Sequence, residues 1–309
     1  MTTLILRALA AGLAVATLTA NSLRVADESP LERQIREIAA APDAGRVGAS
    51  ALLVETGERV SVRGAERFPM QSVFKLPVAL HALHEVDAGR VQLDRKVTLT
   101  PADLLDGGLD PIATEFPRGA TLTVEDLLRR MVANSDNTAV EALLALTGGP
   151  AAVTRRLRDL GIAGVRVDRG ERQLARDLTG RGALERYARD PRDTATPDAA
   201  VDLLVRVLGG GDLLPASQQR LRTWMTETST GLQRIKGLLP AGTPVAHKTG
   251  TGPDRDGVNA ATNDIGLILL PGGRHVALAV FIASSRLPLE AREAIIARVA
   301  KAAFDHWSR

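Results

Sequence analysis

Strand-like alternation occurs near both ends of the chain, and helical periodicity fills most of the middle. Residues 48–64 form two apolar runs around a turn at 55–58, and residues 263–284 form two more around Pro-Gly-Gly at 271–273. Both patterns predict β-hairpins. Because strands from distant parts of a chain can pair in one sheet, we expect both chain ends to build a single antiparallel sheet with helices packed beside it.

The middle of the chain shows a helix start as well as helical spacing. Thr123 and Asp126 stand as a capping box before an apolar stripe at 124–132. A second helix is expected at 196–208, and an amphipathic helix at 289–307 closes the chain. Strands at both ends and helices between them therefore predict a sheet with helices beside it in one protein.

The fold class that follows is α/β, of the α+β type. We expect a single domain over residues 21–309, with flanking helices on the antiparallel sheet. Its α/β lobe spans about 21–70 and 215–309, and a central all-helical lobe spans about 71–214. A cleft between two such lobes is the natural place for a functional site.

The first twenty residues differ from the rest. Arg7 precedes an uncharged apolar run, and small residues lead up to Ala20. This pattern is typical of a secretory signal peptide cleaved near Ala20. The alternative is a buried N-terminal helix, but such a helix normally shows a polar face. We expect an exported protein, periplasmic or secreted, with no membrane segment in its mature form.

The composition excludes several kinds of chemistry. The 39 basic residues are interleaved with 36 acidic ones and only 3% of residues are aromatic, so nucleic-acid binding has little support. The chain has no cysteine, which excludes disulfides and thiol catalysis. His81 and His84 are spaced as His-x-x-His, but no third ligand accompanies them, so we expect no metal and no cofactor. Nothing indicates an oligomer, and a monomer is the expectation.

Ser72 and Lys75 lie three positions apart at an expected helix start. Residues i and i+3 share a helix face, so the ammonium can reach the hydroxyl and help to remove its proton. The alternative is an ordinary helix beginning, where serine is common. Taken alone, the pair does not decide between a nucleophile and a cap.

Two further short motifs follow in the chain. Residues 135–137 read Ser-Asp-Asn at the end of the helix that begins after Thr123, and residues 248–250 read Lys-Thr-Gly at the start of the last sheet segment. Polar residues at a helix end are usually caps, and a lysine on an edge strand often protects the edge. Each motif alone is more often structural than catalytic, whereas the three together in this order favour a catalytic reading.

The combination of Ser-x-x-Lys, Ser-Asp-Asn and Lys-Thr-Gly resembles the class A serine β-lactamases and, more broadly, the penicillin-recognising serine enzymes. Segments 191–197, 230–240 and 262–268 are also similar to that family, so the resemblance covers nearly the whole mature chain. It implies the β-lactamase/DD-peptidase-like fold, no cofactor, and small-molecule β-lactams as binding partners.

The resemblance also implies roles for the motif residues. Ser72 is expected to be the acylated nucleophile, with Lys75 helping to activate it. Ser135 would pass a proton to the departing lactam nitrogen, and Lys248 would hold the Ser135 hydroxyl in a positive field. The backbone N–H groups of Ser72 and Thr251 would form the oxyanion hole.

Substrate contacts are implied in the same way. Asn137 would bind the side-chain amide of the substrate, and Lys248, Thr249 and Thr251 would bind its carboxylate. Family members often add an arginine for that carboxylate; Thr262 occupies one of its usual places, and Arg234 matches the other. The alternative for Arg234 is an ordinary exposed arginine on a helix.

Deacylation in the family uses a glutamate in the pattern Arg-x-Glu-x-x-Leu-Asn, which Arg169 and Glu171 match. Glu171 is therefore the expected general base. The pattern breaks at its final Asn, which is Ala175 here and cannot help to hold the hydrolytic water. The loop also carries extra residues before Asp193, which makes a site widened for bulky cephalosporins a hypothesis. Glu185 lies in this stretch as an alternative base.

Two other functions remain open. A DD-peptidase or penicillin-binding protein shares the acylation residues and acts on peptidoglycan stem peptides; Ala175 supports that reading, and the Arg169-x-Glu171 match opposes it. A non-catalytic β-lactam-binding protein would keep the fold but form no covalent adduct. Leu109 departs from the family as well, because many members place an aromatic residue there.

Overall fold

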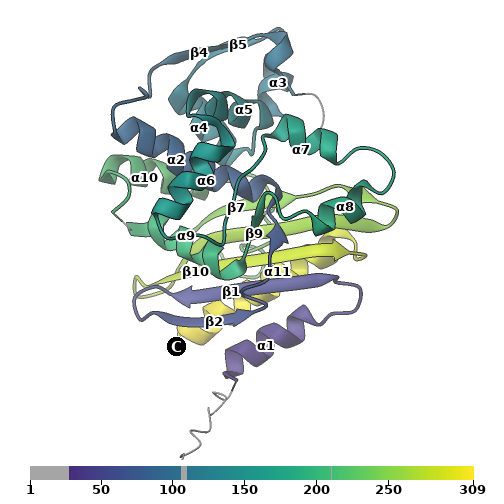
Figure 1. Cartoon of the computed structure of the whole chain (residues 1–309). Helices are drawn as coiled ribbons and strands as arrows, with labels where there is room; N and C mark the ends of the chain where they lie inside the picture. The colour runs from purple at the N-terminus through teal and green to yellow at the C-terminus, as the bar shows by residue number, and fades with distance from the viewer. Residues whose placement is uncertain (1–27, 106–109, 210) are drawn as a thin grey trace, which may run out of the picture.

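The computed structural model describes residues 28–105, 110–209 and 211–309. Its main sheet has the strand order β2-β1-β10-β9-β7, with β8 paired to β9, and all of these pairs are antiparallel. The strands are β1 (Arg46–Leu53), β2 (Glu58–Val62), β7 (Val245–Thr251), β8 (Asp254–Arg255), β9 (Val258–Leu269) and β10 (His275–Ser285). The antiparallel sheet predicted from both chain ends is confirmed (Figure 1).

Short strands join the segments outside this sheet. β3 (Phe68–Pro69) pairs with β6 (Thr194–Ala195), and β4 (Lys96–Leu99) pairs with β5 (Ala120–Thr123). The β3–β6 pair matters for the site because it ties the residues just before Ser72 to the residues just after Asp193.

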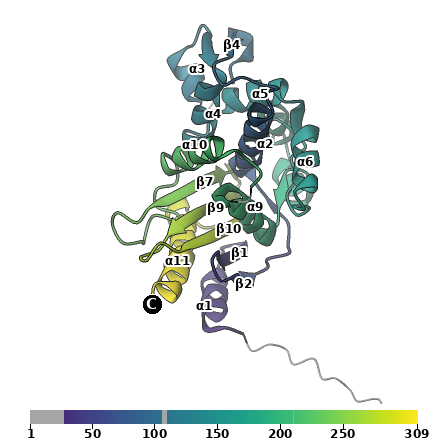
Figure 2. The same cartoon turned by 90° about the vertical axis from the view of Figure 1, so that its left-hand side faces the viewer.

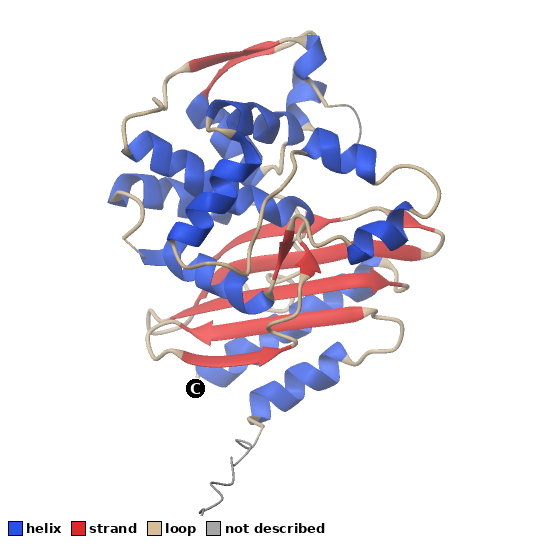
Figure 3. Cartoon of the chain, in the orientation of Figure 1, coloured by secondary structure: helices blue, strands red, loops and turns tan. Residues whose placement is uncertain are grey.

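One group of helices lies beyond the β7 edge of the sheet, and other helices cover the two faces of the sheet (Figures 2 and 3). The helices before the middle of the chain are α1 (Pro30–Ala39), η1 (Gln71–Phe74), α2 (Lys75–Asp87), η2 (Pro101–Asp103), α3 (Pro111–Glu115), α4 (Val124–Ala133), α5 (Asn137–Leu146) and α6 (Gly149–Asp159). The later helices are α7 (Glu171–Asp177), α8 (Ala183–Arg189), α9 (Pro197–Gly209), α10 (Pro215–Thr226) and α11 (Leu289–Trp307).

Alternation along β10 explains why the sheet is covered on both faces. Ala277, Ala279 and Phe281 belong to one hydrophobic cluster, which they share with α9 and the helices around α2. Val276 and Leu278, whose side chains point the opposite way, belong to a second cluster with α1 and α11. A strand that is apolar on both faces has to be buried on both faces, and the two helix layers supply that burial.

Local signals in the sequence account for the helix starts. The Thr123 hydroxyl accepts a hydrogen bond from Asp126 N at 3.1 Å, and the Asp126 carboxylate accepts one from Thr123 N at 3.2 Å, so the predicted capping box is confirmed. The terminal helix occupies 289–307 as predicted. Asp136 caps α5 by accepting from Ala139 N at 2.7 Å, which fixes the loop between α4 and α5.

Some predictions lie outside the described residues. These are the signal peptide at 1–20 with its cleavage site at Ala20, and the missing aromatic residue at Leu109. The bounds of the two lobes stay a prediction. Within the described part of the chain, no helix combines the length and the apolar character needed to cross a membrane.

Candidate active site

Ser72 and Lys75 lie where a short 3-10 helix passes directly into α2. Ser72 is in η1, Lys75 is the first residue of α2, and the Lys75 ammonium lies 3.0 Å from Ser72 Oγ. Ser72 is half-buried, whereas Lys75 is fully buried. Pro77 is tolerated because it falls in the first turn of α2, where a missing N–H breaks no helical hydrogen bond. The predicted contact between the two side chains is present.

The Lys75 ammonium joins three separate segments of the chain. It donates to Ser135 O at 2.7 Å, in the loop before α5, and to Oδ1 of Asn137, the first residue of α5. It also lies 3.0 Å from Glu171 Oε1 on α7. One buried cation therefore connects Ser72 with the Ser-Asp-Asn motif and with the glutamate of the later loop.

Ser135 is presented by an unusual backbone conformation. Its φ of 62° lies in the left-handed region, between the end of α4 and the start of α5. There its hydroxyl accepts from Lys248 Nζ at 3.0 Å and lies 3.5 Å from Lys75 Nζ. A serine hydroxyl between two ammonium groups is suited to pass a proton and to stabilise the charge that remains.

The ionisation of Lys248 is set by its surroundings. Burial lowers the pKa of this fully buried ammonium well below its ordinary value, and the nearby Lys75 lowers it further. The carboxylates of Asp264 and Glu171 oppose that shift. Whether Lys248 carries a charge at neutral pH therefore depends on the acidic groups around it.

The Asp136 carboxyl adds a titrating group to the same loop. Burial raises its pKa to about 6, and the adjacent Asp110 adds to the rise. When ionised, Asp136 accepts from Ile112 N at 2.8 Å and from Ala139 N. The loop that presents Ser135 therefore changes its charge near pH 6.

Strand β7 approaches η1 so closely that only glycine fits at position 250. A Cβ on Gly250 would lie 2.3 Å from Met70 O and 3.1 Å from Val73 N. This approach brings the edge strand that carries Lys248 and Thr251 against the helix that carries Ser72. Gly250 is therefore required for this packing, while Lys248 and Thr249 supply the polar groups of the motif.

Arg234 is not the exposed helical arginine considered as an alternative, which was wrong. It lies in a turn segment and is 3% exposed. Its guanidinium donates to Asn263 O at 2.9 Å and to Thr251 Oγ1 at 2.8 Å, and it pairs with Glu293 at 3.1 Å. Arg234 thus orients the Thr251 hydroxyl, while Thr249 Oγ1 shares a hydrogen bond with Thr230.

The loop that carries Glu171 is anchored by a buried arginine. Arg169 Nε lies 2.5 Å from Asp193 Oδ2, and its Nη1 lies 2.6 Å from Asp177 and 3.0 Å from Asp190. Its side chain is 1% exposed. Asp193 also accepts from Arg169 N, so the two ends of the loop are closed together.

Glu171 begins the short helix α7 within this loop. Its Oε1, although close to Lys75, has no hydrogen-bond partner among the described residues, so it can still accept one. Ala175 stands one turn further along α7 and is exposed, and its methyl group offers no polar contact there. A water beside Glu171 must therefore be held by other groups.

Sequence reasoning missed a link between the inserted loop and the site. Tyr187 on α8 accepts a hydrogen bond from Gln71 Nε2 at 2.6 Å, and Gln71 adjoins Ser72 with a left-handed φ of 48°. Tyr187 is the chain's one tyrosine, buried with Leu174, Leu178 and Ala260. The sequence signal that could have indicated this link is a single aromatic residue within the long loop before Asp193.

The remaining candidates are not among the contacts of Lys75. Glu185 on α8 lines a cavity that Tyr187 also borders, and His81 Nε2 on α2 lies 2.8 Å from Thr147 O. Among the described residues, no group of three or more His, Asp or Glu side chains is arranged to hold a metal ion.

Comparison with known proteins gives a consistent set of relatives. The sequence model of the β-lactamase enzyme family matches residues 30–307. β-Lactamase VEB-1 of Pseudomonas aeruginosa is 36% identical over 264 residues, covering 85% of this chain and 85% of the relative. Extended-spectrum β-lactamase PER-1 of the same organism is 37% identical over 286 residues, covering 92% and 90%.

Solved structures agree with these relatives. A β-lactamase from Chitinophaga pinensis has a TM-score of 0.84 at 34% identity, covering 90% of this chain and 99% of its own. The TLA-3 extended-spectrum β-lactamase has a TM-score of 0.84 at 31% identity, covering 90% and 98%.

Proposed function

The chain belongs to the class A serine β-lactamase family, and from this premise we propose how its own residues hydrolyse the β-lactam amide of penicillins and cephalosporins. The protein is an enzyme of antibiotic resistance. The observation that carries the proposal is the position of the Lys75 ammonium, within 3.0 Å of both Ser72 Oγ and Glu171 Oε1.

Acylation starts at Ser72. Its Oγ attacks the lactam carbonyl carbon while its proton passes to the Lys75–Glu171 pair, and the C–N bond of the lactam then breaks. The backbone N–H groups of Ser72 and Thr251 hold the oxyanion, and the close approach of β7 to η1 supports that assignment. Ser135 delivers its proton to the departing nitrogen, supported by Lys248 at 3.0 Å, and takes the proton that left Ser72 from Lys75, whose Nζ lies 3.5 Å from Ser135 Oγ.

The substrate carboxylate is held at the β7 edge. Lys248 supplies a positive charge there, and the Thr249 and Thr251 hydroxyls supply hydrogen bonds. Arg234 acts on this contact through Thr251 Oγ1, to which it donates at 2.8 Å. Asn137 binds the side-chain amide of the substrate with its carboxamide, whose oxygen also accepts from Lys75.

Deacylation uses Glu171. The Glu171 carboxylate, which lies 3.0 Å from the Lys75 ammonium, accepts a proton from a water molecule, and the resulting hydroxide attacks the ester on Ser72. Ala175 cannot hydrogen-bond to that water. The water therefore has fewer side-chain contacts here than in a protein with asparagine at position 175. The C–O bond of the ester then breaks, the proton on Glu171 returns to Ser72 Oγ by way of Lys75, and the opened drug leaves.

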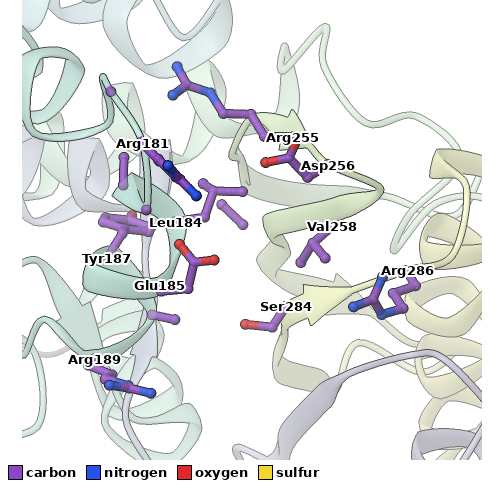
Figure 4. A pocket seen from close by; sticks show the side chains of 15 residues that line it. Arg181, Leu184, Glu185, Tyr187, Arg189, Arg255, Asp256, Val258, Ser284 and Arg286 are labelled. Carbon is purple, nitrogen blue, oxygen red and sulfur yellow. The ribbon is translucent and has the colours of Figure 1, made fainter.

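A cavity of about 420 Å³ lies between α8 and the β8–β9 hairpin (Figure 4). Glu185 and Arg181 face it from the α8 side, and Val258 and Ser284 face it from the strands. Its size suits a drug-sized group. Tyr187 forms part of its wall and reaches Gln71 beside Ser72, so we assign this cavity to bulky side chains of cephalosporins. The extended-spectrum names of PER-1 and TLA-3 support this assignment.

Filling the cavity is expected to separate the two drug classes. Val258→Trp should lower kcat/KM for a bulky oxyimino-cephalosporin by about tenfold and leave benzylpenicillin nearly unchanged, because only the larger side chain needs the space. Leu238→Trp, at an exposed position outside the cavity, is the matched control. Negligible cephalosporin turnover by the unmodified enzyme would show that the cavity does not serve this purpose.

The reaction itself is tested by mass spectrometry of the purified protein mixed with benzylpenicillin, following enzyme and drug over time. We expect a short-lived adduct on Ser72 and rapid conversion of the drug to penicilloate. A persistent adduct with little product would instead favour a DD-peptidase, since Ala175 weakens water positioning. Absence of any adduct would favour a binding protein.

The residue pattern at 1–20 supports a cellular location for the enzyme. Export to the periplasm or outside the cell, with cleavage near Ala20, is supported by the charged, apolar and small-residue pattern at 1–20. The enzyme works as a monomer, needs no cofactor or metal, and is built from an α/β lobe and a helical lobe that meet at the site.

A further inference from the structure

Asn263 of β9 contacts the segment that leads into Ser72, and its side chain has no part in the reaction proposed above. The residue is fully buried. Its carboxamide nitrogen donates to Pro69 O at 2.9 Å and to Met70 O at 3.0 Å. Its carboxamide oxygen accepts from Ile282 N at 3.3 Å, on the neighbouring strand β10. Both polar atoms of this side chain are therefore used, and two of its hydrogen bonds cross from the sheet to the chain just before Ser72.

The strand register explains how a side chain of β9 reaches past β7. Asn263 lies directly opposite Gly250. Side chains of directly opposed residues share one face of the sheet, and position 250 has no side chain there. A Cβ on Gly250 would lie 2.3 Å from Met70 O. The carbonyl that occupies the space left by Gly250 is therefore one of the two that Asn263 binds.

The bonds of Asn263 hold two consecutive peptide groups close to Ser72. Met70 O also accepts from Val73 N at 3.2 Å, in the turn that contains Ser72. Only Gln71 separates the Met70 carbonyl from the Ser72 N–H. The φ of Gln71 is 48°, in the small left-handed region that leaves an L-residue little freedom to adjust. A displacement of the Met70 carbonyl would therefore be passed on to the Ser72 N–H.

Hydrogen-bond alternation along β7 gives the direction of the Thr251 N–H. Gly252 N donates to Ala261 O at 2.8 Å, across the β7–β9 pair. In an antiparallel pair, residues whose N–H bonds to the partner strand alternate with residues whose N–H points away from it. Thr251 precedes Gly252, so its N–H points away from β9. Since β7 is the last strand in the sheet order, this N–H is directed to the outer edge of the sheet.

We propose that Asn263 is a positioning residue for the oxyanion hole of the β-lactamase reaction. Its carboxamide ties the chain before Ser72 to the strand that pairs with β7, and so fixes the distance between Ser72 N–H and Thr251 N–H. The inference rests on the proposed function, in which these two N–H groups hold the lactam oxygen. Its effect falls on every step that forms an oxyanion, because preorganised donors act where charge develops.

The kinetic test uses Asn263→Leu, which removes both donors and keeps the approximate size of the side chain. Acylation and deacylation form an oxyanion at the same carbonyl, so both should slow by the same factor. For benzylpenicillin, kcat should fall by about 10- to 100-fold with KM nearly unchanged, since a misplacement of about 1 Å can cost that much. Single-turnover acylation of Ser72 should slow equally, and its rate constant does not depend on how much of the protein is folded.

Infrared difference spectroscopy reports the hydrogen bonds of the acyl carbonyl itself. The adduct on Ser72 is accumulated in a Glu171→Gln background. Adding Asn263→Leu should move the ester C=O band to higher wavenumber, because displaced N–H groups polarise the carbonyl less. Thr262→Val is the matched control: Thr262 adjoins Asn263 on β9, is equally buried, and donates to Asn259 Oδ1 at 2.9 Å. The control should leave both the band and the acylation rate constant unchanged.

Equal C=O bands and equal acylation rate constants in Asn263→Leu and Thr262→Val would overturn the inference. Asn263→Asp is the second variant if the leucine variant does not fold. It keeps the side-chain shape and the acceptor for Ile282 N but retains at most one donor, so it should show the same two changes, and an unmoved band there also overturns the inference. Absence of any adduct on Ser72 while Asn263 is intact would instead contradict the proposed function.

Discussion

Replacing Glu171 by glutamine is expected to trap the drug on Ser72. Glutamine keeps the size of the side chain and its contact with Lys75 but cannot accept a proton from water. General-base catalysis contributes about 10²- to 10⁴-fold, so kcat should fall by that factor. Acylation should persist, because Ser72 still lies 3.0 Å from Lys75 and its oxyanion groups are unchanged. The adduct should then remain on the protein for minutes or longer.

Intact-protein mass spectrometry with benzylpenicillin measures this outcome directly. Glu290→Gln, an exposed glutamate in the first turn of α11, is the matched control and should clear the adduct as fast as the unmodified enzyme. Unchanged turnover in Glu171→Gln would move the general base elsewhere. Glu185→Gln would then be the next variant, since Glu185 is the other glutamate of the inserted loop.

Replacing Arg169 by methionine is expected to destabilise the enzyme strongly. The guanidinium pairs with three carboxylates, and of these Asp193 is almost completely buried. Removing one partner of a buried ion pair costs about 3–5 kcal/mol, because the remaining charges stay buried without compensation. That loss corresponds to a fall in Tm of roughly 10 °C. Deacylation should slow as well, since the same loop holds Glu171.

Acid should reduce this difference. The pKa of Asp190 lies below its ordinary value: burial raises it, but hydrogen bonds from Arg192 and the charge of Arg169 outweigh burial. A carboxyl with a lowered pKa stabilises the fold above its unfolded pKa, and the contribution is lost as the pH falls through the folded value. Arg169→Met keeps the hydrogen bonds from Arg192 and removes only the effect of the Arg169 charge, so the unmodified enzyme loses more stability in acid than the variant by that part alone.

Thermal unfolding at neutral and acidic pH checks both statements. Arg176→Met makes the same substitution in the same loop at an exposed position, and it should melt like the unmodified enzyme. Equal melting temperatures for Arg169→Met and Arg176→Met at neutral pH would mean that the buried cluster does not stabilise the loop.

Local patterns predicted most of the fold. The hairpin at 263–284, the capping box at Thr123 and the helix at 289–307 were all confirmed, because apolar periodicity and capping depend on neighbours within a few positions. The family was also recognised from three short motifs. The order and spacing of these motifs along the chain indicate the family without any knowledge of three-dimensional contacts.

The sequence patterns did not predict which distant segments of the chain come into contact. That Lys75 touches Ser72 follows from helix geometry, but that it also touches Ser135 and Glu171 depends on how α4, α5 and α7 pack. The burial of Arg234, which contradicts only the alternative of an exposed helical arginine, has the same cause. A turn segment buried under β7 has no periodicity that distinguishes it from an exposed helix.

The sequence by itself determined the fold class, the family, and the residues from which a catalytic serine could be chosen. Only the tertiary structure decided which charges lie together: Arg169 with its three aspartates, and Lys75 with Glu171. The physical reason is that protonation and ion pairing depend on desolvation and on distances of a few ångströms between residues far apart in the chain. Patterning along the chain reports which residues are buried, and the fold decides which of them meet.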